Sequence, residues 1–284
     1  MEFKGNKYRR SRDWNLLELA LKLGVNQMKD KIFEAELQYK KGFSHVDDQG
    51  SYFKLEDPRL PDMRAHNIVI LKSGTPLEES KKIIADNLNW RKSEGCDFLT
   101  VISFDRLTAE DLNFTDIQPK IDLSDYMSIE TASTASLKFI ENAEVMLADN
   151  EKDLKAGKMI DIEANEGTMG ETFVVKRINR KIEVYKDETV PLDFYVIYYK
   201  GEPAGNCELF LGNEIAQIED FDILPKFQRM GLGTHFVKVL LNIAGSKGYK
   251  NAFVITDHFD SAKEMYKKCG FSYEGTVTEL LYNL

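Results

Sequence analysis

The first part of the chain alternates short apolar runs with a helix-start signal. Residues 67–71 and 97–104 are apolar runs of strand length, bounded by polar or turn residues. Between them, Thr75 and Pro76 precede two glutamates, which indicates a helix that ends near Gly95. Strand, helix and strand in this order predict a βαβ unit with a right-handed crossover.

The segment before this unit has helical spacing followed by turn residues. Apolar residues recur at helical spacing from Asp13 to Lys41, with an interruption near Gly24, and this pattern predicts two short helices. Residues 50–61 are rich in turn-forming residues and are predicted as turns.

The pattern changes after a polar segment at residues 105–122. Apolar positions are first spaced as in helices and then as in strands, and three successive strands predict an antiparallel meander. The elements expected here are a strand at 126–131, helices at 133–149 and 166–185, strands at 194–199, 204–211 and 215–224, a helix after 233, a strand at 251–256, a helix ending near 270, and strands at 271–274 and 276–282.

The length and the polar segment together predict two domains. A chain of 284 residues exceeds the usual size of one domain, and the segment at 105–122 is the natural boundary. We therefore expect an N-terminal α/β domain at residues 1–115 and a second domain at 122–284, both of the α/β (α+β) class.

Composition and charge narrow the class of protein. The content of 43% hydrophobic and 30% charged residues is that of a folded protein, and the formal net charge of -9 disfavours nucleic acid or an anionic membrane as partner. No run approaches the roughly 20 apolar residues of a membrane span, and residues 1–13 lack the apolar core of a signal peptide, so we expect a cytoplasmic protein. The 3 cysteines and 4 histidines lack the spacing of a disulfide framework or metal site, so no metal is expected.

The turn at residues 228–233 carries the clearest chemical signal. It joins the strand at 215–224 to an amphipathic helix, and its glycines, Gly231 and Gly233, permit backbone conformations and approaches that a Cβ would block. Successive N–H groups ahead of a helix form a cradle for anions such as phosphate. The turn lacks the Gly-Lys-Ser/Thr of a Walker loop and the first glycine of a dinucleotide fingerprint.

These residues resemble the GNAT superfamily of acyl-CoA-dependent N-acyltransferases, whose signature turn is Arg/Gln-x-x-Gly-x-Gly/Ala. Gln228, Gly231 and Gly233 match that pattern, and the spacing Ala-x-x-x-Tyr-x-x-x-Gly-Phe around Tyr266 matches the next landmark. The resemblance spans residues 122–284. It implies a mixed, mostly antiparallel sheet flanked by helices.

The resemblance also implies site residues and a cosubstrate, acetyl-CoA. In the family the turn amides bind the CoA pyrophosphate and the preceding strand binds pantetheine. The residues that correspond here are Phe221, Asp222 and Ile223 for pantetheine, and Arg229, Met230, Gly231, Leu232, Gly233 and Thr234 for the pyrophosphate. Tyr266 corresponds to the group that protonates the CoA sulfur, and the alternative is that it only packs its helix onto the sheet.

Glu219 is the first choice for a general base. Strand alternation puts Gln217, Glu219 and Phe221 on one face and Asp220 and Asp222 on the other, unless a bulge intervenes. A carboxylate on this central strand deprotonates an ammonium or binds a cationic substrate, and the alternative is a solvated or salt-bridged acid.

The expected function is transfer of an acetyl group from acetyl-CoA to a primary amine of a small molecule, a peptide or a lysine, by direct attack in a ternary complex. The alternative is a non-catalytic acyl-CoA sensor, because Phe259 stands where many family members have an asparagine that touches pantetheine. We expect a monomer or homodimer. The order of elements in the N-terminal part suggests a degenerate second domain of the same type that walls the substrate cleft.

Overall fold

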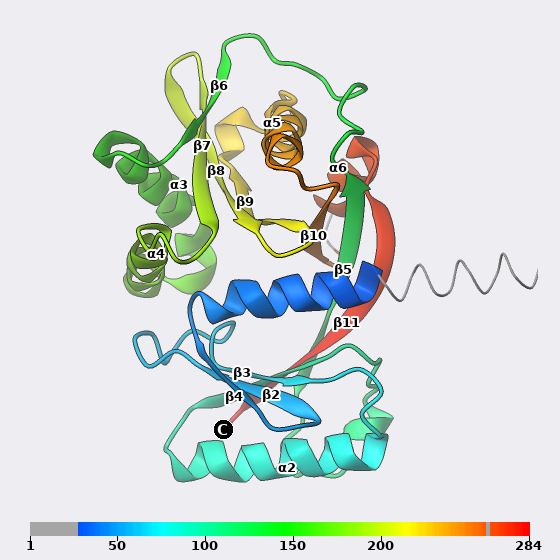
Figure 1. Cartoon of the computed structure of the whole chain (residues 1–284). Coiled ribbons are helices and arrows are strands. Elements are labelled where there is room, and N and C mark those ends of the chain that lie inside the picture. Colours follow the sequence, from blue (N-terminus) through cyan, green and yellow to red (C-terminus); the bar gives the residue numbers. More distant parts are fainter. Residues whose placement is uncertain (1–27, 260–261) are drawn as a thin grey trace, which may run out of the picture.

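The computed structural model describes residues 28–259 and 262–284, and within them eleven strands form one mixed sheet (Figure 1). The strand order is β1-β2-β3-β4-β11-β5-β10-β9-β8-β7-β6. All neighbouring pairs are antiparallel except β3 with β4 and β9 with β10. The predicted mixed, mostly antiparallel sheet flanked by helices is therefore confirmed.

The N-terminal part begins with a helix over residues 28–41, called here the crossing helix. In Figure 1 this blue helix lies across the middle of the molecule, between the βαβ unit below and the larger group of strands above. The elements that follow are β1 (His45–Asp48), β2 (Tyr52–Glu56), β3 (Ile68–Leu71), α2 (Leu77–Ser93), β4 (Phe98–Ser103) and a short 3-10 helix (Glu110–Leu112). The predicted βαβ unit corresponds to β3, α2 and β4.

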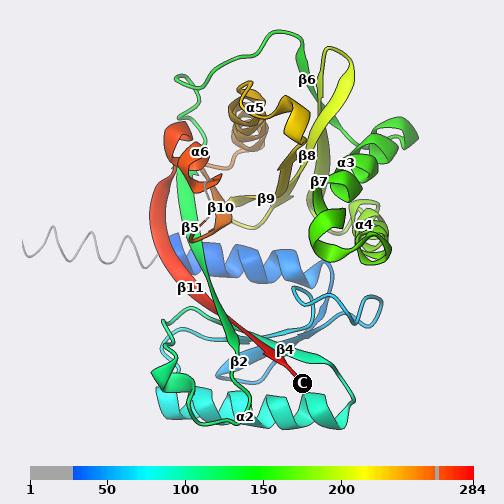
Figure 2. The ribbon, with the colours of Figure 1, turned by 180° about the vertical axis from the view of Figure 1, so that it is seen from behind.

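The larger group of strands contains the main core. Helices α3 and α4 pack on one face of β7, β8 and β9, and α5 lies on the other face with α6 beside it (Figures 1 and 2). The elements are β5 (Lys120–Glu130), β6 (Ala143–Leu147), α3 (Glu151–Met169), α4 (Glu171–Tyr185), β7 (Leu192–Tyr199), β8 (Glu202–Leu211), β9 (Ala216–Ile223), a 3-10 turn (Pro225–Phe227), α5 (Leu232–Ser246), β10 (Asn251–Asp257), α6 (Ala262–Cys269) and β11 (Ser272–Asn283).

Strand β11 connects the two parts of the sheet. It pairs with β5 over residues 272–281 and with β4 over residues 278–283, both antiparallel. It is one long strand with an irregularity between Tyr273 and Gly275, where two strands were predicted. The division at residues 115–122 stays a prediction, and the strands on its two sides share this sheet.

The helix predicted at residues 133–149 is wrong. Residues 132–142 form turns and extended chain, Asn142 has a positive φ of 62°, and the segment ends in the edge strand β6. Its apolar residues do not share one helical face, because Leu137 is buried whereas Phe139 is 72% exposed.

Helix α3 was not predicted, because its buried face is narrow and contains few large apolar residues. The Asn150 side chain caps it by accepting from the Asp153 amide at 3.0 Å. Gly157 lets the helix lie directly against the Phe194 ring, which a Cβ would overlap. The helix predicted at 166–185 is divided near Gly170 between α3 and α4.

The remaining predicted elements are present with small shifts, and β2 lies where turns were predicted. The helix predicted before Gly24 lies outside the described residues. None of the described helices has the length and apolar character that a membrane crossing requires.

Candidate active site

The site lies where β9 and β10 separate. These parallel strands pair at three positions, the last being Ile218 with Val254. Beyond it β9 continues to Ile223, and no described strand pairs with that edge. Backbone groups of residues 220–222 that point to this edge are therefore available for an extended ligand.

A β-bulge lies in the open part of β9. Glu219 pairs with Glu208 and Asp222 pairs with Asn206, so Asp220 and Phe221 together oppose one residue of β8. Asp220 has a positive φ of 47°, which is unusual for a residue other than glycine.

Two cations of α4 hold the bulge. Arg177 and Lys181 both donate to the same Asp220 carboxylate oxygen. Burial alone would raise the pKa of Asp220, but the charges of Arg177 and Lys181 outweigh it and lower that pKa. Lys181 also donates to buried Glu208 at 2.6 Å, and Arg177 to Asp161 at 2.7 Å. The strained residue is thus fixed by a buried ionic network.

The bulge changes the predicted alternation of side chains. Asp220 reaches α4 and the Asp222 side chain accepts from Asn165 of α3 at 3.3 Å, so both lie on the α3/α4 face with Glu219 and its partner Glu208. Phe221 points to the opposite face, against Phe236 and Tyr266. The face of α3 and α4 is therefore acidic, and the face of α5 and α6 is apolar.

The glycine turn after β9 is built as predicted. Gly231 is the N-cap of α5 and has φ of 86°. A Cβ at Gly233 would lie 2.8 Å from the Met265 sulfur, so the glycine permits close packing of α5 on α6. The Gln228 side chain donates to the Ile223 carbonyl at 2.9 Å and fixes the turn to the end of β9.

The first amides of α5 are free to bind an anion. No described side chain caps this helix, and its first amide with an intrahelical backbone acceptor is that of His235. The N–H groups of Leu232, Gly233 and Thr234 point outward at the positive end of the helix dipole. The Leu232 side chain is buried, so that residue offers only its backbone.

A pocket of about 680 Å³ connects this turn with Tyr266. It runs from β9 along the N-terminus of α5 to α6. Its lining residues are Phe221, Ile223, Phe227, Gln228, Arg229, Gly231, Gly233, Thr234, Ala262, Glu264, Met265, Tyr266 and Lys268. The pocket joins many of the predicted cofactor residues, whereas the Met230 side chain is 43% exposed and does not line it, and the Asp222 side chain lies on the other face.

Tyr266 of α6 lines this pocket. Its ring packs against Phe221 and Phe271, and no described residue hydrogen-bonds its hydroxyl. Burial, and then Cys207 and Glu219, raise its pKa well above the usual value, so the hydroxyl stays protonated at neutral pH.

Glu219 lies on the acidic face with a shifted pKa. It is half-buried and accepts from the Gln217 side chain at 3.1 Å, which also donates to Glu36 of the crossing helix at 2.8 Å. Burial, then the charges of Glu36 and Asp220, raise the pKa of Glu219 to about 8. A carboxylate with such a pKa is suited to accept a proton near neutral pH.

Several polar residues of this face were not identified from the sequence. Glu36 lies in a segment for which only a short helix was predicted. Asn206 lies in a segment for which only a strand of a hairpin was predicted. The sequence signal that indicates such residues is a polar position inside an otherwise apolar element, such as Asn206 and Glu208 in β8.

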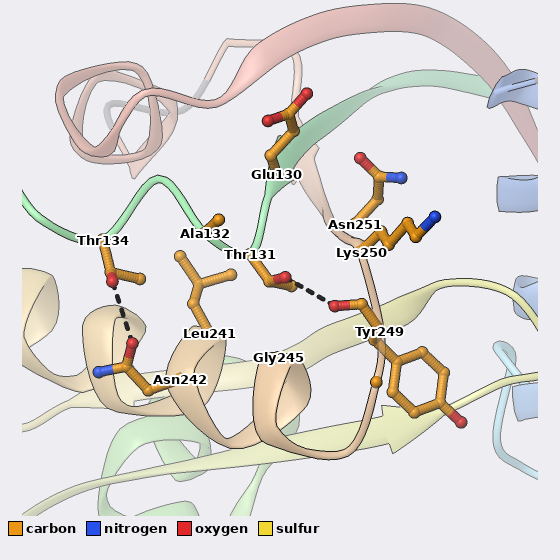
Figure 3. Close-up of a pocket in the computed structure, with 11 residues that line it drawn as sticks. Glu130, Thr131, Ala132, Thr134, Leu241, Asn242, Gly245, Tyr249, Lys250 and Asn251 are labelled. Carbon is orange, nitrogen blue, oxygen red and sulfur yellow. Dashed lines mark hydrogen bonds between the residues drawn. The ribbon is translucent and has the colours of Figure 1, made fainter.

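Another hollow lies at the far end of α5 (Figure 3). It is lined by Thr131, Thr134, Asn242 and Lys250, among others, and two of its hydroxyls are already bonded, Thr131 to the Tyr249 carbonyl and Thr134 to Asn242. The 15-residue α5 separates it from the glycine turn by roughly 20 Å. It takes no part in the arrangement described above.

Among residues 28–259 and 262–284, no group of three or more His, Cys, Asp and Glu residues is arranged to hold an ion. His235 is buried and accepts from the Ile140 amide at 3.1 Å. His258 contacts Asp125 at 2.8 Å, close to the start of α6.

Comparison with known proteins finds similarity to acetyltransferases. Residues 165–271 match the model of the acetyltransferase (GNAT) family. The protein described as uncharacterized N-acetyltransferase CgeE of Bacillus subtilis is 27% identical over 251 residues, which cover 82% of this chain and 90% of that protein. The beta-lysine N(6)-acetyltransferase of Methanococcus maripaludis is 24% identical over 97 residues, 33% of this chain and 35% of that protein.

Two solved structures share the fold over most of the chain. A functionally unknown protein from Staphylococcus epidermidis has a TM-score of 0.73 at 17% identity, covering 85% of this chain and 95% of its own. A GCN5-related N-acetyltransferase from Kribbella flavida has a TM-score of 0.68 at 14% identity, covering 89% and 94%.

Proposed function

We propose that this chain transfers an acetyl group from acetyl-CoA to a primary amine by direct attack in a ternary complex, because residues 165–271 match the model of the acetyltransferase (GNAT) family. The observation that carries the proposal is the division of β9 into two faces. The pocket with the glycine turn and Tyr266 opens on the α5/α6 face, and Glu219 lies on the opposite face. The two substrates approach the same strand from opposite sides.

The glycine turn and β9 hold acetyl-CoA. Amides from Arg229 to Thr234 bind the pyrophosphate, and the open edge of β9 at residues 221–223 binds pantetheine through its backbone. The thioester then lies beside the bulge, where an N–H of Phe221 or Asp222 polarises its carbonyl.

Glu219 and Tyr266 move the protons. Glu219 takes a proton from the acceptor ammonium, directly or through water, and the neutral amine attacks the thioester carbon. The C–S bond breaks as the tetrahedral intermediate collapses, and Tyr266 donates its proton to the departing sulfur. The proton that the former amine nitrogen loses on forming the amide is released to solvent, and solvent returns a proton to Tyr266. The products are the N-acetyl amine and CoA.

The acceptor is a small molecule, a peptide or a lysine side chain. The Methanococcus maripaludis relative is named for an amino group of beta-lysine, and its similarity to this chain is compatible with a small acceptor. The acidic face supports a cationic acceptor in each case. We propose that the protein acts as a monomer or homodimer in the cytoplasm.

The proposal is tested with Glu219→Gln and Tyr266→Phe, assayed for both acetyl-CoA binding and turnover. We expect both variants to be stabilised by acetyl-CoA in a thermal shift, as the parent is, since a ligand that binds only the folded state raises stability. We expect turnover to fall by about 100-fold or more for Glu219→Gln, within the range for a lost general base. Glu144→Gln, an exposed change on β6, is the matched control.

The competing function is an acyl-CoA sensor. It is favoured by Phe259, which is 83% exposed where family members have an asparagine. If the parent binds acetyl-CoA but acetylates none of a broad panel of amines, the sensor function is supported and the enzyme function is contradicted. Absence of any acetyl-CoA binding would contradict both.

A further inference from the structure

The acidic face of β9 has buried acceptor oxygens that lack donors. Among the described residues, the buried oxygens Gln217 Oε1, Asn206 Oδ1 and Asp161 Oδ1 have no hydrogen-bond partner. Gln217 and Asn206 are 0% and 1% exposed. A buried acceptor without a donor costs about 1–3 kcal/mol, so three of them around one strand point to a donor-rich ligand.

The first group of acceptors lies before the bulge. Gln217 uses its amide N–H₂ on Glu36 and Glu219, which leaves its oxygen beside these two carboxylates. Lys40 of the crossing helix bonds the other Glu36 oxygen at 2.9 Å, and Glu219 has no cationic partner among the described residues.

The second group lies after the bulge. Asp222 has one hydrogen bond, from Asn165 at 3.3 Å, and no ion pair within the described chain. Its cross-strand neighbour Asn206 donates to the Gly157 carbonyl at 3.0 Å and keeps its oxygen free. Asp161 binds Arg177 through one oxygen, and the other has no partner.

The protein's own cations leave Glu219 and Asp222 without an ion pair among the described residues. Arg177 and Lys181 are bound to Asp220, which lies between the two groups in sequence, and to Asp161 and Glu208. Burial, and then the negative charges of Asp220 and Asp161, raise the pKa of Asp222 to about 6. Glu219 and Asp222 therefore remain as two separate unpaired carboxylates on one face.

The spacing of the groups follows from their register. Glu219 pairs with Glu208 and Asp222 pairs with Asn206, two residues along β8. Two residues of strand span roughly 7 Å, so the two carboxylates leave the sheet about that far apart.

We infer that the acceptor is a diamine, with one amino group at Glu219 where it reacts and a second ammonium bound by Asp222, Asn206 and Asp161. An alkylammonium has three donors and no acceptor, which matches the free oxygens of Gln217, Asn206 and Asp161. The buried Arg177 Nε, a donor without a partner, belongs to a guanidinium that is already paired with Asp161 and Asp220. This inference rests on the proposed acetyl transfer and specifies its substrate class.

The test compares 1,4-diaminobutane with n-butylamine, which has the same carbon chain and one amine fewer. In the parent we expect kcat/KM for the diamine to exceed that for the monoamine by about tenfold or more, since a hydrogen bond to a charged group contributes about 1.5–3 kcal/mol. Asp222→Asn should reduce this ratio to near one, mainly through the KM of the diamine. Glu144→Gln should leave the ratio as in the parent.

A second measurement separates this inference from the proposed function. With CoA present, 1,4-diaminobutane should raise the melting temperature of the parent more than n-butylamine does, and Asp222→Asn should remove the difference. Equal kcat/KM values for the two amines, or an unchanged ratio in Asp222→Asn, overturn the diamine and leave acetyl transfer intact. If the diamine stabilises the protein but is not acetylated, the diamine site is supported and the proposed acetyl transfer is contradicted. If the diamine neither stabilises the protein nor is acetylated, the diamine site and the acetyl transfer are both contradicted.

Discussion

The protein contains two βαβ units with the same strand pairing and different turns. In the first, β3–α2–β4, β3 is antiparallel to β2 and β4 is antiparallel to β11. In the second, β9–α5–β10, β9 is antiparallel to β8 and β10 is antiparallel to β5. The two units thus provide the same framework for a ligand site at the start of their helices.

The turns decide which unit can bind an anion. In the first unit, Asp105 accepts from the Gly74 amide at 2.7 Å, so a carboxylate of the protein lies in the turn, and Pro76 provides no N–H. In the second unit, Gly231 and Gly233 leave the helix amides free. A shared order of elements therefore does not imply a shared activity, which depends on the turn.

The N-terminal part, outside its βαβ unit, makes contacts with the site. The crossing helix brings Glu36 to Gln217 and Glu219, and α4 reaches both parts, with Arg180 bonded to Asp57 and the Phe43 carbonyl. These contacts support the hypothesis that the N-terminal part walls the substrate cleft. Its description as a degenerate domain of the same type stays a prediction.

The largest effect is expected from the two arginines of α4. Arg177→Met and Arg180→Met each remove one partner of a buried ion pair, and each should lower the free energy of unfolding by about 3–5 kcal/mol in chemical denaturation. Only Arg177→Met should also reduce kcat by about tenfold, because Arg177 holds the bulge whereas Arg180 holds Asp57, which follows β2 in the N-terminal part. Equal loss of kcat in both variants would contradict this division of roles.

The glycines of the two turns provide the next test. Gly233→Val would place atoms against Met265 and should weaken acetyl-CoA binding by about 100-fold, which corresponds to about 2.7 kcal/mol. Gly74→Ala meets no atom within 4 Å and alters only the turn of the first unit, so binding should stay as in the parent. Titration calorimetry measures both, and weakened binding in Gly74→Ala would show that the first turn takes part.

A smaller effect is expected on the pH profile. Glu219 must be ionised to accept a proton, so kcat/KM should rise as the pH passes its pKa of about 8. Glu36→Gln removes a neighbouring negative charge, which lowers that pKa, and the profile should move to lower pH by up to about one unit. The acceptor amine is the same for parent and variant, so its own ionisation cancels in the comparison. A shift of the profile to higher pH would contradict the assignment of Glu219 as the general base.

The smallest effect is expected from Asp105→Ala, which frees the Gly74 amide of the first turn. Pro76 still provides no donor, so we expect the variant, like the parent, to bind a single acetyl-CoA per chain. A second equivalent in equilibrium dialysis would show that Asp105 alone had closed an otherwise competent site.

The sequence predicted what depends on local pattern. The turn at residues 228–233 and the strands and helices around it follow from glycine positions and apolar periodicity, and they place Tyr266 and the helix amides correctly along the chain. The bulge at Asp220 depends on Arg177 and Lys181, about forty residues earlier, and no local pattern reveals that contact.

The same limit explains the missed elements. Helix α3 is stabilised by packing against Phe194, and β6 by pairing with β7, so both depend on partners that are distant in sequence. Glu36 belongs to the site only because the crossing helix packs beside Gln217, which is distant from it in sequence. The roles of the predicted site residues, Glu219 and Tyr266 included, remain predictions until tested.

The position of β11 constrains the order in which the chain folds. This strand lies between β4 and β5, yet the ribosome makes it after every other described strand. Until it is synthesised, β4 and β5 each present an open edge, which is where nascent chains associate with one another. Closure of the sheet therefore waits for β11, and a chain that stops before this strand leaves the edges of β4 and β5 unpaired.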